Sequence, residues 1–348
     1  MDASFSEVAN KAVSHYPIKA DKIMLLSFKG PKSVWAIQTD AGEAILKKIP
    51  ISEERLKFMI HAIEYLKGNG VRTPGVFRTK TGESYVRSDG ENFILLEAIR
   101  GRSPEYEIEE ELLLVLKGMA LFHKASRGIE VPPGTKATSH LGEWNEDFAK
   151  RINQLEQWQQ ERSRATHKTE FDVLFLKHAD ALLEQARSSL DLLDQPPYRQ
   201  WVEAAKTEKW LNHQDYAAGN LAITATGELY VYDMDSLTFD LPVRDIRKIL
   251  NKVMKKRDRW DLELMVKMLK AYQEVHPLTK DQYSVLMADL RFPHLFYGQV
   301  SKYYQNREPG WTPHKHVSRL NDMIAAETSK EAVLQSFESR IDEVIGLG

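Results

Sequence analysis

Strand-like and helix-like patterns fall in different parts of this sequence. Short apolar segments rich in β-branched residues lie between residues 22 and 99, and one further hairpin pattern lies at 221–235. From residue 107 onward the rest of the chain shows amphipathic helical periodicity. Successive strands joined by short turns pair antiparallel, whereas a parallel sheet needs a crossover helix between strands. The sequence therefore predicts an α+β fold with two lobes: a small antiparallel sheet lobe over residues 1–98 and a larger, mainly helical lobe over residues 99–348.

The predicted sheet lobe begins with a three-strand meander. Its strands are expected at KIMLLSF (22–28), SVWAIQT (33–39) and EAILKKI (43–49). One helix follows over residues 51–70, where apolar side chains recur at helical spacing. The near-continuous apolar segment NFILLEAI (92–99) is typical of a buried strand and would close the lobe.

Composition excludes several classes of chemistry. The 348 residues contain no cysteine, so disulfides, thiol nucleophiles and cysteine-ligated metals are excluded. Lysine and arginine number 48 against 50 aspartate and glutamate, so the whole protein generates no field that favours nucleic acid or an anionic membrane. No segment approaches the roughly 18 apolar residues that a spanning helix needs. We therefore expect a cytoplasmic protein with neither a nucleic-acid nor a membrane partner.

The most informative motif lies at the predicted hairpin. It reads HQDYAAGN from His213 to Asn220, with Asp215 in third place, and Asp233 follows at the end of the next strand. Phosphoryl transfer needs a carboxylate to accept or orient a hydroxyl proton, and an amide oxygen and a second carboxylate to hold Mg²⁺ on the triphosphate. A hairpin delivers all three groups from its open end, so the motif predicts a kinase-like site. The alternative is a polar loop in which these residues have only turn roles.

The chain resembles the aminoglycoside phosphotransferase and choline kinase superfamily, whose members share the protein-kinase fold but phosphorylate small molecules. Within it, the sequence is most similar to the spore-coat-associated CotS-type kinase-like proteins of endospore-forming bacteria. The resemblance covers nearly the whole chain. It rests on Leu46-Lys47, FILLEAIRGR (93–102), LKGMALFHKAS (116–126), HQDYAAGN, YDMDSL (232–237), PVRDI (242–246) and, for the narrower group, RFPHLFYGQVSKYYQNR from Arg291.

This resemblance implies roles for the hairpin motif. Asp215 would be the catalytic base, and Asn220 and Asp233 would be the ligands of Mg²⁺. His213 is expected to be structural, with its ring bonded to the backbone of the catalytic loop.

The resemblance also implies an ATP site in the sheet lobe. Lys47 would contact the α- and β-phosphates, although Lys48 leaves the register uncertain by one residue. The backbone around Glu97, Ala98 and Ile99 would meet the adenine.

Two features depart from the family pattern. A glutamate on the helix of the sheet lobe normally pairs with the strand lysine, but the expected position holds Met59. The nearby glutamates at 53–54 and 64 could substitute only if the helix were shifted or rotated. The phosphate loop FKGPKSV has a single glycine, Gly30, followed by the rigid Pro31, so few backbone N–H groups can approach phosphate.

Two functions remain open at this point. The first is an ATP-dependent phosphotransferase that acts on a hydroxyl of a small-molecule metabolite such as a sugar, a choline-like amine or an amino-acid alcohol. The second is a noncatalytic, kinase-like scaffold of the spore coat. A location in the spore coat, with coat proteins as partners, is compatible with either.

Overall fold

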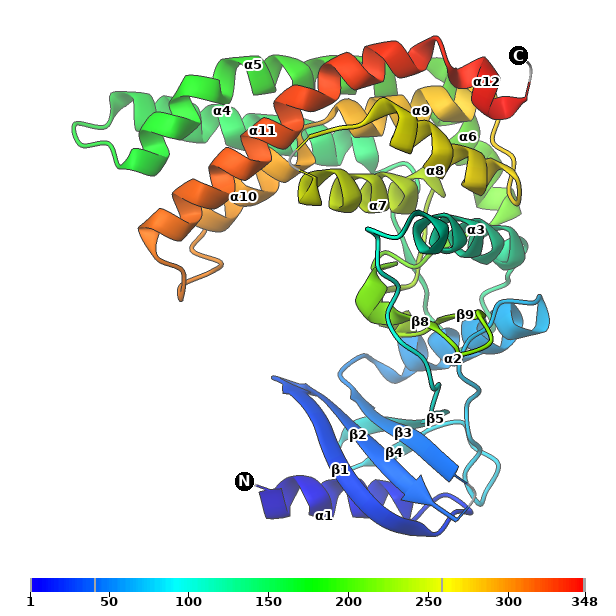
Figure 1. Ribbon diagram of the computed structural model, residues 1–348. Helices are drawn as coiled ribbons and strands as arrows, with labels where there is room; N and C mark the ends of the chain where they lie inside the picture. Colours follow the sequence, from blue (N-terminus) through cyan, green and yellow to red (C-terminus); the bar gives the residue numbers. More distant parts are fainter. Residues whose placement is uncertain (1, 41, 258, 347–348) are drawn as a thin grey trace. The chain divides into compact units, whose positions relative to one another are not determined.

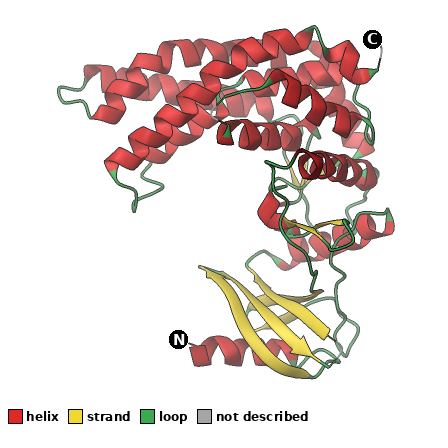
Figure 2. Ribbon diagram, in the orientation of Figure 1, coloured by secondary structure: helices red, strands yellow, loops and turns green. Residues whose placement is uncertain are grey.

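The computed structural model describes residues 2–40, 42–257 and 259–346, and it divides into two compact units. The first unit comprises Met1–Ser139 and Lys209–Phe239, and the second comprises His140–Glu208 and Asp240–Gly348. The expected order of an antiparallel sheet followed by a mainly helical chain is confirmed (Figures 1 and 2). The lobe boundary expected at residue 98 lies inside the first unit and stays a prediction.

The first unit is built on a five-stranded antiparallel sheet with the order β1-β2-β3-β5-β4. Its strands are β1 (Ala20–Lys29), β2 (Lys32–Thr39), β3 (Gly42–Ile49), β4 (Val86–Ser88) and β5 (Glu91–Glu97). Its helices are α1 (Asp2–Val13), α2 (Glu53–Gly68) and α3 (Glu109–Ser126). The remaining elements are β6 (Thr138–Ser139), β7 (Leu211–Asn212), β10 (Thr238–Phe239), the hairpin strands β8 (Leu221–Ile223) and β9 (Leu229–Val231), and the 3₁₀ turns η1 (Ala218–Asn220) and η2 (Met234–Ser236).

One face of the sheet is covered by α1, as Figure 1 shows. Trp35 and Ile37 alternate along β2 and are almost fully buried, together with Phe93 of β5. The rings of Trp35 and Phe93 lie 6.3 Å apart, and both belong to the same apolar cluster as Ala12 of α1. This period-two burial fixes the register of the sheet, because a slip of one residue would turn these side chains to the opposite face.

The β8–β9 hairpin is joined to the chain segment that follows β5. Arg102 and Ile223 exchange two backbone hydrogen bonds, of 3.0 and 2.8 Å. Gly101 approaches this bridge so closely that a Cβ atom would lie 2.8 Å from the carbonyl oxygen of Ile223. The segment after β5 and the end of β8 are therefore held in one register.

The second unit is helical. Its helices are α4 (Trp144–Arg164), α5 (Glu170–Leu193), α6 (Pro196–Glu208), α7 (Val243–Lys256), α8 (Leu262–Gln273), α9 (Lys280–Arg291), α10 (His294–Tyr304), α11 (Pro313–Glu338) and α12 (Ile341–Ile345). Among the described residues, no helix combines the length and the apolar character that a bilayer crossing requires.

A buried polar cluster lies in the interior of the second unit. His294 donates from Nε2 to Asp289 Oδ1 over 2.8 Å, and Asp289 Oδ2 accepts from Arg247 over 3.2 Å. Arg151 lies 3.4 Å from the other ring nitrogen of His294. Burial and the charge of Arg247 lower the pKa of His294 to about 3, despite the opposing effect of the hydrogen bond that His294 donates to Asp289. The histidine is therefore neutral in the folded protein at neutral pH.

Candidate active site

The predicted site residues of the first unit, except Asp215, line one cavity of about 530 Å³. The open end of the β8–β9 hairpin contributes Asn220 and Asp233, and β3 contributes Lys47. The end of β5 and the residues after it contribute Glu97 and Ile99. The other lining residues are Leu26, Ser27, Val34, Glu43, Ile45, Pro74, Leu96, Ala98, Gly101, Ser103, Gly219, Ala222 and Tyr232.

Lys47 is the strand lysine that reaches the hairpin. Its ammonium lies 2.6 Å from Asp233 Oδ1, whereas Lys48 points away and pairs with Glu91 at 3.2 Å. Burial alone would raise the pKa of Asp233, but the charge and hydrogen bond of Lys47, together with Lys32, hold it below its ordinary value. Asp233 is therefore ionised at neutral pH, and the sheet and the hairpin are joined by a direct ion pair.

Asp215 lies beside the cavity rather than in its wall. Asn220 Nδ2 donates to Asp215 Oδ2 and to the Asp215 carbonyl, each over 2.9 Å. These bonds orient the exposed Asp215 carboxylate. They also leave the amide oxygen of Asn220 without a hydrogen bond among the described residues, so this oxygen is available to a cation.

The backbone between His213 and Asp233 is held in unusual conformations at two positions. Gln214 and Asp233 have φ values of 68° and 65°, in the left-handed region that favours glycine. Such conformations persist where the surroundings over-determine them, and they cluster at functional sites. His213 is fully buried and bonds the carbonyl of Tyr232 over 3.0 Å, which ties the start of the motif to the strand before Asp233. This contact agrees with the structural role predicted for His213.

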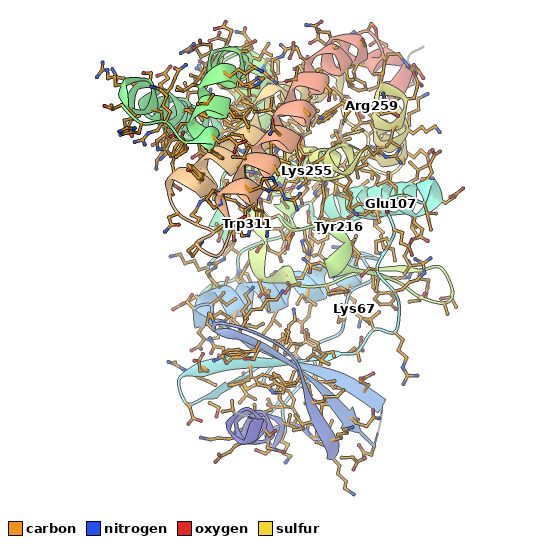
Figure 3. The ribbon with its side chains drawn as sticks, turned by 60° about the vertical axis from the view of Figure 1, so that its left-hand side comes forward. Lys67, Glu107, Tyr216, Lys255, Arg259 and Trp311 are labelled. Carbon is orange, nitrogen blue, oxygen red and sulfur yellow. The ribbon has the colours of Figure 1, made fainter. Side chains whose placement is uncertain are left out.

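An aromatic ring of α3 packs against the segment that carries Asp215. The ring of Phe122 meets those of His213 and Tyr216 edge-on, with centroids 5.8 and 6.2 Å apart. Tyr216, labelled in Figure 3, follows Asp215 directly and is itself buried. The loop that carries Asp215 is therefore packed on a rigid apolar layer.

The end of β5 has free backbone donors where an adenine is expected. Ile99 N–H makes no hydrogen bond with any described residue, whereas Glu97 N–H donates to the Gly75 carbonyl over 3.0 Å. The Glu97 side chain turns away to Gly75 N–H and to Lys67, which Figure 3 labels. Backbone groups near Ile99 therefore present polar atoms to this part of the cavity.

Met59 lies where the family pattern has a glutamate. It is buried in α2 and lines a small cavity together with Lys47 and Asp233. The glutamates considered as substitutes are used elsewhere: Glu53 pairs with Lys57 at 2.7 Å, and Glu64 pairs with Arg78. Asp233 is thus the carboxylate that holds Lys47 in this structure.

Two charged residues that the sequence analysis did not single out belong to this site. Lys32 begins β2 directly after the turn at Gly30 and Pro31, and its ammonium lies 2.7 Å from Asp235 Oδ2. Asp235 lies in η2, two residues after Asp233, and its side chain is only 9% exposed. The sequence could have indicated Lys32, because it lies at the tip of the phosphate loop. The glycine-poor turn leaves few other hydrogen-bond donors for a phosphate at this position.

The oxygen donors of the hairpin fit a hard divalent cation. A carboxylate and an amide oxygen are ligands that suit Mg²⁺, which commonly takes one or two carboxylates together with substrate phosphates and water. No cluster of three or more acidic or histidine side chains among the described residues could hold a metal by itself. The donor set therefore suits a cation that is shared with a bound phosphate chain.

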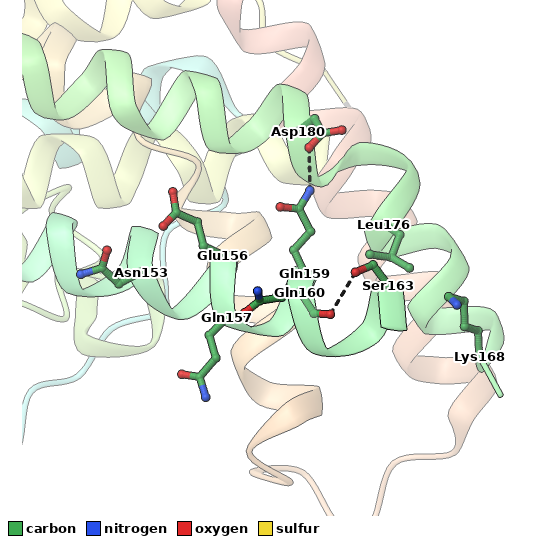
Figure 4. A pocket seen from close by; sticks show the side chains of 9 residues that line it. All are labelled: Asn153, Glu156, Gln157, Gln159, Gln160, Ser163, Lys168, Leu176 and Asp180. Carbon is green, nitrogen blue, oxygen red and sulfur yellow. Dashed lines mark hydrogen bonds between the residues drawn. The ribbon is translucent and has the colours of Figure 1, made fainter. Parts of the chain in front are cut away.

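A second hollow, of about 880 Å³, lies on the second unit between α4 and α5 (Figure 4). Several of its polar side chains already have hydrogen-bond partners: Gln159 donates to Asp180 over 2.6 Å, and Ser163 donates to the Gln160 carbonyl over 2.9 Å. None of the predicted site residues lines it. We assign no chemistry to this hollow.

Comparison with known proteins places the chain in a family. Residues 13–337 match the family described as "Spore coat putative kinase YutH". The chain belongs to this family. Among the relatives within or near it, spore coat protein S of Bacillus subtilis (strain 168) is 33% identical over 328 residues, which cover 94% of this chain and 93% of that protein. The endospore coat-associated protein YutH of the same organism is 24% identical over 258 residues, 74% of this chain and 72% of that protein.

Solved structures share the fold of this chain. An aminoglycoside phosphotransferase from Alicyclobacillus acidocaldarius superposes with a TM-score of 0.83 at 19% identity, covering 96% of each chain. Spectinomycin phosphotransferase APH(9)-Ia, solved with ADP and spectinomycin, gives 0.63 at 12% identity over 96% of this chain and 98% of that one. Amicoumacin kinase hAmiN, solved with AMP-PNP and Ca²⁺, gives 0.60 at 17% identity over 95% and 93%. The predicted protein-kinase-like fold is therefore confirmed.

Proposed function

We propose that this protein is an ATP- and Mg²⁺-dependent phosphotransferase that acts on a hydroxyl group of a small-molecule metabolite. The observation that carries this proposal is the shared cavity of the first unit. Lys47, Asn220 and Asp233 line one end of it, and free backbone donors near Ile99 line another part. Half-buried apolar side chains such as Val34 and Ile45 lie between them and suit the faces of an adenine ring.

The proposal gives a role to each part of the site. The Ile99 region binds the adenine edge, and Lys47 binds the α- and β-phosphates. Asn220 and Asp233 hold Mg²⁺, which would neutralise charge on the phosphates when bound. Asp215 accepts the proton of the acceptor hydroxyl. Its carboxylate is oriented by Asn220 and is exposed outside the cavity wall, so an acceptor molecule can reach it.

A transfer assay tests the proposed activity. Purified protein is incubated with γ-labelled ATP, Mg²⁺ and a panel of sugars, choline-like amines and amino-acid alcohols, and labelled product is measured. Asp215→Asn should lower transfer by about 10²- to 10⁴-fold because the base is lost while the loop shape is kept. Asp21→Asn, a change at an exposed carboxylate on β1, is the matched control and should transfer at the wild-type rate. Full activity in Asp215→Asn would contradict the assigned role.

A noncatalytic scaffold is the second candidate function, and Met59 is the observation that favours it. Without a glutamate at this position, Lys47 is held by Asp233, a group that the proposed kinase needs for its metal. Thermal unfolding with millimolar ATP, with and without Mg²⁺, separates the two functions. The kinase predicts a rise in melting temperature that needs both, and a scaffold without a nucleotide site predicts none.

We further propose that the protein is made in the cytoplasm and associates with coat proteins of the spore. The support is the relationship to spore coat protein S and to the coat-associated YutH protein. A fluorescent fusion expressed in an endospore-forming host should move to the spore surface during coat formation. A fusion that stays dispersed through the mother cell would contradict this association.

A further inference from the structure

The tip of the β1–β2 hairpin cannot bind phosphate in the usual way. The turn consists of only Gly30 and Pro31 between two paired strands. A phosphate loop works by directing several backbone N–H groups at the ligand, and proline has none. The backbone of this turn therefore offers little to a triphosphate.

The side chain of Lys32 supplies a cation at the same place. It extends from the first residue of β2 to Asp235, 2.7 Å away. Burial would lower the pKa of Lys32, but Asp235 raises it, and Asp233 and Asp215 add to this effect through their charges. The ammonium therefore lies within the electrostatic reach of all three carboxylates of the site.

Two lysines thus enter the carboxylate cluster from neighbouring strands. Lys47 of β3 pairs with Asp233, and Lys32 of β2 pairs with Asp235. Of the two, Lys32 is the one at the tip of the hairpin, and its side chain is 47% exposed against 15% for Lys47. An exposed ammonium on a flexible stem can turn from one anionic partner to another.

We propose that Lys32 is a catalytic residue that binds the terminal phosphate of ATP. When the nucleotide enters, the Lys32 ammonium breaks its ion pair with Asp235 and binds the γ-phosphate oxygens instead. This assignment rests on the proposed phosphotransferase function. Charge spreads over the equatorial oxygens of the transferred phosphoryl group, and a fixed cation there stabilises it. Lys32 does with a side chain what a glycine-rich loop does with backbone N–H groups, and it lies near Asp215, where the acceptor hydroxyl must meet the phosphate.

Nucleotide binding measured by calorimetry in the presence of Mg²⁺ tests this proposal without an acceptor. Lys32→Met should weaken ATP binding by about ten- to a hundredfold, the value of a charge-assisted hydrogen bond, and change ADP binding by less than about threefold. Lys29→Met is the matched control. Lys29 pairs with Lys32 in the strand register, but it is exposed and forms no ion pair with any described residue, so both affinities should match the wild type.

A second variant distinguishes phosphate binding by Lys32 from a purely structural role of the Lys32–Asp235 ion pair. Asp235→Asn releases Lys32 from its carboxylate, so the proposal predicts unchanged or tighter ATP binding. If the Lys32–Asp235 ion pair only held the site in shape, Asp235→Asn and Lys32→Met would both weaken the binding of ATP and of ADP to the same extent. That result would overturn the proposal. Melting temperatures without nucleotide check that each variant folds.

The outcomes also distinguish this inference from the function on which it rests. Wild-type protein that binds neither ATP nor ADP would refute the phosphotransferase and the role of Lys32 together. Wild-type protein that binds both, with Lys32→Met keeping the same preference for ATP over ADP, would refute only the role of Lys32.

Discussion

Single side chains decide whether this site can hold a metal–nucleotide complex, and substitution of Asp233 tests this most directly. Its carboxylate pairs with Lys47 in the structure and would have to accept Mg²⁺ as well. Asp233→Asn keeps the shape but removes the charge, so we expect the Mg²⁺-dependent part of the ATP-induced thermal shift to disappear. In the wild type, ATP·Mg²⁺ at 100 times its dissociation constant should stabilise the fold by about 2.7 kcal/mol, a shift of a few degrees.

The control for this prediction is a carboxylate at the other end of the same hairpin. Glu228 lies at the β8–β9 turn and pairs with Arg72 on the surface. Glu228→Gln should keep the full Mg²⁺-dependent shift. A normal shift in Asp233→Asn would show that the metal is held elsewhere.

At the scale of elements, the site depends on the register between β5 and the β8–β9 hairpin. Gly101→Ala would place a methyl group 2.8 Å from the Ile223 carbonyl and 3.1 Å from the Ala222 side chain, which forces the two segments apart. We expect a loss of about 1–3 kcal/mol in the free energy of unfolding, measured by urea titration, together with weaker ATP binding.

Gly68→Ala provides the matched comparison at the end of α2. No atom lies within 4 Å of the Cβ position there. This change should leave stability the same or slightly higher, because alanine favours a helix more than glycine does. Equal effects of the two substitutions would mean that the contact at Gly101 does not set the register.

For the molecule as a whole, the buried histidine of the second unit makes stability depend on pH. The pKa of His294 is about 3 in the fold and about 6.5 in an unfolded chain. Between these values the unfolded chain binds a proton that the folded one does not, so the free energy of unfolding decreases as the pH falls, by up to about 1.4 kcal/mol per pH unit. Burial raises the pKa of Asp289, but Arg247 and His294 lower it by more. The free energy of unfolding therefore decreases further as the pH falls below about 4, because the unfolded chain then binds a proton at Asp289 before the folded protein does.

Urea unfolding at pH 7 and pH 5 measures this dependence. His294→Gln should reduce the pH slope by about one proton, since glutamine does not titrate. His314→Gln, at an exposed position near the start of α11, should keep the wild-type slope. An unchanged slope in His294→Gln would show that the histidine is already protonated in the fold.

The local sequence determined the elements and the identity of the chemical groups. Period-two burial around Trp35, the HQDYAAGN motif and the distance to Asp233 are local patterns, because alternation and hairpin spacing act over a few residues. They were enough to predict the antiparallel sheet lobe and the hairpin, both of which the structure contains.

Only the tertiary structure decided which charges meet. The sequence favoured Lys47 as the phosphate-binding lysine but left the register uncertain by one residue. In the structure, Lys47 pairs with Asp233 and Lys48 pairs with Glu91. The pairing of Lys32 with Asp235 joins residues about two hundred positions apart, and no local pattern encodes such a contact. Long-range ion pairs depend on how strands are ordered and how far a hairpin extends, so they follow from packing rather than from propensity.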